Sequence, residues 1–79
     1  MSDIRTKLMQ IIAEFANVEP AALVDCKTIA DLPLDSIGML GVFDEVEEVY
    51  EVKVEGITPE TSLDEFEAVL TRLVAAKNA

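Results

Sequence analysis

The chain of 79 residues contains no histidine and a single cysteine, Cys26. An intrachain disulfide is therefore excluded, and a zinc site built from the usual nitrogen and sulfur ligands is not expected. Without histidine, the sequence also lacks the base that most often activates a serine or cysteine nucleophile. We therefore interpret Cys26 as a partly exposed residue without a catalytic role, and we do not expect the chain to be an enzyme.

Basic residues are scarce, since six Lys and Arg stand against sixteen Asp and Glu and give a formal net charge of −10. This charge disfavours nucleic acid and anionic membranes as partners, and it favours a protein with a basic patch. No apolar run approaches the roughly 20 residues of a membrane span, and the polar amino terminus does not resemble a signal peptide. Hydrophobic residues make up 51% of the chain, which argues against disorder. We expect a folded, cytoplasmic monomer.

Three segments carry apolar residues at helical spacing. The first covers about residues 3–16 and the second about residues 36–51. The third begins with a capping box, Ser62-x-x-Glu65, and continues to about residue 74. These patterns predict three longer amphipathic helices.

The two connections differ in character. Residues 17–35 form a long loop with several apolar residues that can anchor it, and we expect a helical turn near residues 20–23. Residues 51–55 alternate like a strand but have no second strand to pair with, so we interpret them as an extended connector. A short helical turn is expected between residues 56 and 61. The sequence thus predicts one domain, residues 1–79, with an all-α fold: a small bundle of three longer helices and one short helix.

The second helix has an apolar and an acidic side in the predicted arrangement. The residues expected to face the core are Ile37, Leu40, Phe43, Val46, Val49 and Tyr50, and the acidic residues are Asp44, Glu45, Glu47, Glu48 and Glu51. Like charges one turn apart repel by a few tenths of a kcal/mol. Such a stripe is most often a solvated face, but it also suits a basic partner.

Gly38 and Gly41 are unusual inside this helix, because each costs roughly 1 kcal/mol relative to alanine. Unless they reflect neutral drift, something approaches the helix backbone closely at these positions. Met39 is expected to lie off the core side as a partly exposed, adaptable contact.

Ser36 follows Asp35 where the long loop ends and the second helix begins. A serine at such a place is most often a helix cap. A catalytic role would need a base and an oxyanion hole, and the pattern offers no histidine or suitable lysine. From these residues alone, the cap is the more ordinary interpretation.

The tripeptide Asp35-Ser36-Ile37 resembles the Asp-Ser-Leu type of signature found in acyl carrier proteins. The resemblance extends over essentially the whole chain and includes Asp31-Leu32 before the signature and Tyr50 at the end of the second helix. It implies that a phosphopantetheinyl transferase attaches 4′-phosphopantetheine from coenzyme A to Ser36. It further implies that the terminal thiol holds acyl cargo as a thioester for enzymes of fatty-acid, polyketide or related pathways. A phosphodiester suits a helix N-terminus, where unpaired amides and the positive dipole end lie.

The resemblance implies two further groups of residues, and the charge pattern supports the first of them. Acyl-loading and acyl-transferring enzymes with basic patches are expected to contact Asp35, Ile37, Gly38, Met39, Gly41, Asp44, Glu45, Glu47 and Glu48. An apolar cargo is expected to be sheltered by Leu40, Phe43, Val46, Tyr50, Val54 and Phe66.

Three positions depart from typical fatty-acid carriers, which resemble Gly-x-Asp-Ser-Leu-Asp with a further glutamate early in the second helix. Pro33, Gly38 and Gly41 occupy those places here. We therefore expect a specialised carrier with a flatter, more apolar partner surface around Met39. Two alternatives remain: a peptidyl or aminoacyl carrier, although Leu34-Asp35 replaces its usual glycine-rich run, and an unmodified acidic helical module that docks onto a basic partner.

Overall fold

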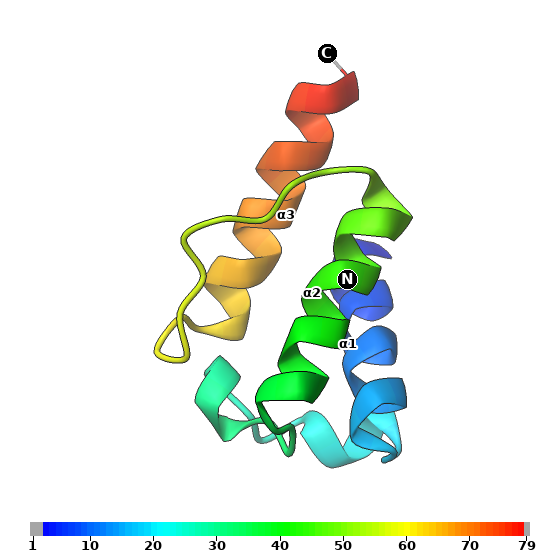
Figure 1. Ribbon diagram of the computed structural model, residues 1–79, viewed down its shortest axis with the longest axis vertical. Helices are drawn as coiled ribbons and strands as arrows, with labels where there is room; N and C mark the ends of the chain where they lie inside the picture. Colours follow the sequence, from blue (N-terminus) through cyan, green and yellow to red (C-terminus); the bar gives the residue numbers. More distant parts are fainter. Residues whose placement is uncertain (1–2, 79) are drawn as a thin grey trace.

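The computed structural model describes residues 3–78, which form three α-helices and two short 3₁₀ helices (Figure 1). In chain order the elements are α1 (Asp3–Ala16), η1 (Pro20–Leu23), η2 (Ile29–Asp31), α2 (Ser36–Tyr50) and α3 (Leu63–Asn78). No strand forms within the described part of the chain, where Thr28 and Ser62 make only an isolated bridge. The prediction of a small all-α fold is therefore confirmed.

The number and place of the short helices differ from the prediction. A 3₁₀ helix does form at Pro20–Leu23, but η2 was not predicted. Residues 56–61 contain a single hydrogen-bonded turn, in which the Thr61 amide donates to the Thr58 carbonyl at 3.0 Å, and no helix. Helix α3 also runs beyond residue 74 to Asn78, and near its end Lys77 pairs with Glu51 at 3.2 Å.

Helix α1 is the centre of the bundle, because it contacts α2, α3 and η1. It contributes a full apolar face to a core that the other elements complete. The buried hydrophobic residues are Leu8, Ile11, Ile12, Ala13, Leu23, Ile29, Leu32, Val42, Val46, Leu63, Phe66 and Leu70. The long loop supplies three of them, Leu23, Ile29 and Leu32, so it is anchored to the bundle as its apolar residues indicated.

The predicted core side of α2 is wrong for several residues. Ile37, Leu40 and Val49 were expected inside, but they are 79%, 62% and 40% exposed. The fully buried residues of α2 are Val42 and Val46, and Met39 packs against the core as well. Met39 therefore lies on the inner side of α2, whereas Leu40 lies on the outer side, which reverses the predicted arrangement.

Gly41 of α2 lies against Phe15, which is close to the end of α1. A Cβ atom at this position would come within 2.5 Å of Cε1 and 2.9 Å of Cδ1 of Phe15. Real Cβ atoms do not approach an aromatic ring this closely, so a larger residue would force the ring to move. The close approach expected at Gly41 is thus made by Phe15 of the same chain.

Backbone hydrogen bonds join the long loop to the connector before α3. The Ile29 amide donates to the Thr61 carbonyl at 3.0 Å, and the Ala30 amide donates to the Pro59 carbonyl at 2.9 Å. Asp31 shapes the loop itself, because its Oδ2 accepts from the amides of Thr28 and Lys27 at 3.1 Å each. These bonds, first that from Thr28, lower the pKa of Asp31. Segment η2 is thereby held beside the connector.

Candidate functional site

Asp35 is the N-cap of α2, and Ser36 is the first residue inside the helix. The Asp35 backbone is extended, with φ −85° and ψ −178°, and its Oδ1 accepts a hydrogen bond from the Gly38 amide at 2.7 Å. Its carbonyl accepts from the Met39 amide at 2.9 Å. The interpretation of Ser36 as the helix cap is therefore wrong, because the neighbouring aspartate fills that position.

The Ser36 side chain is exposed at the start of α2. No hydrogen bond joins its hydroxyl to another residue of the described range 3–78. No base of that range is hydrogen-bonded to it, so the arrangement differs from that of a serine nucleophile, which a base must activate. The local sequence thus presents one hydroxyl on a fixed helix start.

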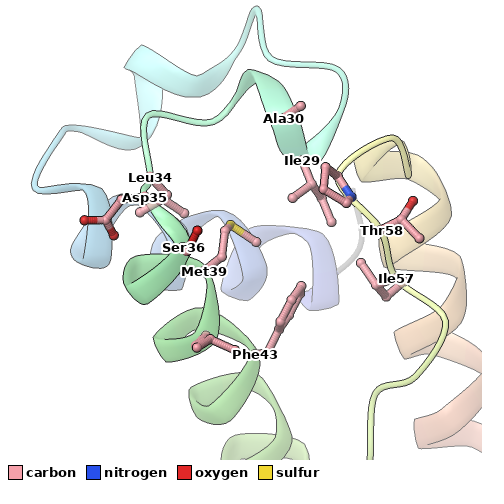
Figure 2. A pocket seen from close by; sticks show the side chains of 11 residues that line it. Ile29, Ala30, Leu34, Asp35, Ser36, Met39, Phe43, Ile57 and Thr58 are labelled. Carbon is pink, nitrogen blue, oxygen red and sulfur yellow. The ribbon is translucent and has the colours of Figure 1, made fainter.

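A cavity of about 400 Å³ opens beside Ser36. Three parts of the chain form it: the start of α2 with the two residues before it, segment η2, and the connector between α2 and α3. Its lining residues are Ile29, Ala30, Leu34, Asp35, Ser36, Met39, Leu40, Phe43, Ile57, Thr58 and Pro59. Figure 2 shows Met39 and Phe43 directed from α2 toward Ile29 and Ile57, whereas the Asp35 carboxylate points away. We refer to this cavity as the Ser36 pocket.

The residues predicted to line a cargo site divide into two groups. Leu40 and Phe43 do line the Ser36 pocket. Val46 and Phe66 are completely buried in the core, and the Phe66 ring lies edge-on behind Phe43 with centroids 5.6 Å apart. Tyr50 and Val54 are partly buried against the core and do not line the pocket.

The opposite walls of the pocket were missed from the sequence. Ile29 and Ala30 come from η2, and Ile57, Thr58 and Pro59 come from the connector. The apolar character of Ile29 and Leu34 indicated that the loop is anchored. It did not indicate which part of the bundle the loop faces, because that depends on the hydrogen bonds to the connector.

The residues predicted to meet a partner are spread over different sides of α2. Ile37, Leu40, Asp44 and Glu48 lie one helical turn apart and are all exposed, so they form a continuous outer face. We refer to these four residues as the outer face of α2. Glu45 beside them is half-buried.

Three other predicted contacts are turned toward the protein itself. A Cβ atom at Gly38 would lie 3.1 Å from Leu34 Cδ2, and the side of Gly41 is covered by Phe15. The Glu47 carboxylate is half-buried and accepts a hydrogen bond from the Val54 amide at 2.7 Å. The sequence suggested one uniform solvated stripe of acidic residues on α2. The structure differs, because Glu47 is turned toward the connector.

No protein-family model, curated protein or solved structure matches this chain. Among residues 3–78, no helix combines the length and the apolar character needed to cross a bilayer. Cysteine and carboxylate side chains of the same residues form no group of three or more that could hold a metal ion.

Proposed function

We propose that this chain is a carrier protein that bears 4′-phosphopantetheine on Ser36. The observation that carries the proposal is the position of Ser36: its exposed hydroxyl begins α2 beside an apolar pocket, while Asp35 performs the capping. The resemblance of Asp35-Ser36-Ile37 to the signature of acyl carrier proteins supplies the identity of the group. A modifying enzyme could reach this serine without breaking a capping hydrogen bond.

The residues around Ser36 fit such a group. The first turn of α2 provides the positive end of the helix dipole, which favours a phosphodiester at this place. The nearest carboxylate, Asp35, is engaged by the Gly38 amide. When bound, the group supplies a terminal thiol that holds cargo as a thioester; the protein supplies the anchoring hydroxyl and the apolar surface next to it.

The Ser36 pocket is the proposed shelter for the cargo. Its volume of about 400 Å³ lies within the roughly 300–1,000 Å³ typical of small-molecule sites. Met39, Leu40, Phe43 and Ile57 give it a mainly apolar lining, which favours an acyl chain over an aminoacyl group. The cargo is thus proposed to be an apolar acyl group of a fatty-acid, polyketide or related pathway.

The outer face of α2 is the proposed contact for the transferase and for the acyl-loading and acyl-transferring enzymes. Ile37 and Leu40 offer apolar area close to Ser36, and Asp44 and Glu48 offer negative charge further along the same face. The net charge of −10 would draw in a partner with Lys or Arg at the matching positions. A cytoplasmic, monomeric carrier without nucleic-acid or membrane partners is consistent with this proposal.

The intact mass of the protein tests the proposal. Incubation with coenzyme A and a phosphopantetheinyl transferase of broad specificity should add one phosphopantetheinyl unit to the wild type and none to Ser36→Ala. Ser62→Ala is the matched control, because Ser62 also stands at a helix start, where its Oγ accepts from the Glu65 amide at 3.0 Å. This control should still gain the unit. A wild type that keeps its unmodified mass would favour the unmodified acidic module.

A further inference from the structure

The side chain of Glu47 does not face solvent with the other acidic residues of α2 but is hydrogen-bonded to the connector between α2 and α3. Its Oε2 accepts from the Val54 amide at 2.7 Å, and its carbonyl accepts from the Val52 amide at 3.1 Å. The carboxylate is half-buried, whereas that of the next residue, Glu48, is exposed. One side chain in an acidic helix thus carries a specific backbone contact instead of facing solvent.

The connector between α2 and α3 is attached at several points: Val52, Val54 and Ile57 pack against the core, and the Thr58 amide donates to Thr61 Oγ1 at 3.0 Å. Beyond Val54 the chain passes Gly56, whose φ of 78° is in the left-handed region and whose Cβ position has no atom within 4 Å. Ile57, Thr58 and Pro59 then form the wall of the Ser36 pocket, and Pro59 accepts from the Ala30 amide. Hydrogen bonds to Glu47 and to Ala30 thus hold the chain on either side of the wall, at Val54 and at Pro59, and the open Gly56 lies between them.

We propose that Glu47 is a positioning residue for the Ser36 pocket. By holding Val54, its carboxylate adds to the core packing of Ile57 and keeps this residue opposite Met39 and Phe43. Without it the connector is held less firmly against α2. Access to the pocket then depends on a side chain of α2 that does not itself line the pocket. This inference deepens the proposed cargo site and rests on it, but it does not depend on whether Ser36 is modified.

Two measurements on the unmodified protein test the inference. The first is the hydrogen-exchange rate of the Val54 amide. The second is the affinity of the pocket for 1-octanol, a neutral apolar probe, followed through the methyl signals of Met39 and Ile57. Glu47→Ala should speed Val54 exchange by about tenfold or more and weaken octanol binding several-fold, because a preorganised wall and a protecting acceptor are lost.

Two matched variants separate the effect of the hydrogen bond made by Glu47 from the effect of its negative charge. Glu48→Ala removes an adjacent negative charge from an exposed site and should leave both values within about twofold of the wild type. Glu47→Gln keeps an oxygen acceptor for the Val54 amide and should restore much of the protection and binding. The inference is overturned if Glu47→Ala behaves like Glu48→Ala, or if octanol fails to perturb Met39 and Ile57 in the wild type. Either result leaves the mass test at Ser36 unaffected.

Discussion

Asp35 and Ser36 divide two tasks at the start of α2. Asp35 accepts the Gly38 amide and so satisfies one of the unpaired donors of the first turn. Ser36, one residue later, lies inside the helix and keeps its hydroxyl exposed. From the sequence the two residues could exchange these roles, because both types are good N-caps. The backbone decides between them: Asp35 is extended and precedes the helix, whereas Ser36 is already the first helical residue.

This division predicts different stabilities for two neighbouring substitutions. Asp35→Ala removes the cap and should lower the free energy of unfolding by about 1 kcal/mol. Ser36→Ala replaces a residue inside the first turn and should change it by no more than a few tenths of a kcal/mol. Urea denaturation at neutral pH, with equal m-values, measures both. Asp35→Asn keeps a capping oxygen and serves as the control; a larger loss for Ser36→Ala than for Asp35→Ala would contradict the assignment.

Helix α2 presents three different sides to its surroundings. Val42 and Val46 face the core, Gly41 faces Phe15 of α1, and Ile37 and Leu40 face outward. Apolar residues occur on all sides of its first half, so the helical period alone cannot select which of them is buried. The helical spacing was enough to predict the existence and bounds of the helix, but not its rotation. The rotation follows from tertiary contacts, which bury Val42 and Val46 and place Gly41 against Phe15.

The contact between Gly41 and Phe15 can be tested with a double-mutant cycle. Gly41→Ala alone should destabilise the protein, because the new Cβ would meet the Phe15 ring at 2.5 Å. In a Phe15→Ala background the same change should stabilise it by up to about 1 kcal/mol, the usual helix preference for alanine over glycine. The sign of the effect is the measured outcome in thermal or urea unfolding. Additive effects with no change of sign would show that the ring yields without cost.

The Gly41 contact also decides how the partner surface should be probed. Introducing an acid by Gly41→Glu would disturb the packing of α1 on α2, so weaker partner binding would not report a direct contact. Ile37 and Leu40 are better sites for that purpose, since both are largely exposed on the outer face of α2.

The whole molecule combines a predictable scaffold with less predictable connections. All three helices begin and end within a few residues of their expected bounds, because each has a clear apolar period. The connections depend on hydrogen bonds between segments far apart in sequence, such as those from Ala30 to Pro59 and from Ile29 to Thr61. No local pattern encodes these pairs. Segment η2 and the connector form two walls of the Ser36 pocket, so the sequence predicted the serine but only part of the pocket.

The net charge of −10 acts on the molecule as a whole. Its dimensions are 34 × 26 × 20 Å, comparable to the Debye length of roughly 30 Å at 0.01 M salt and well above the roughly 8 Å at 0.15 M. At low salt almost every acid therefore feels the others, whereas at physiological salt only neighbours interact. The ion pairs of Arg5 with Asp64 and of Lys77 with Glu51 lie at the surface, where such pairs contribute little. Repulsion should therefore outweigh attraction when screening is weak.

We accordingly expect the melting temperature to rise as sodium chloride increases from 0.01 M to 0.15 M. Sodium chloride is preferred over sulfate, because sulfate also strengthens hydrophobic burial. A variant with two exposed acids neutralised, Glu19→Gln with Glu60→Gln, should melt higher than the wild type at low salt and respond less to added salt. Differential scanning calorimetry on both proteins measures the two slopes. A flat or falling melting temperature for the wild type would mean that self-repulsion does not limit the stability of this fold. If the melting temperatures of the two proteins rose equally with salt, the net charge would not be the cause of the salt effect.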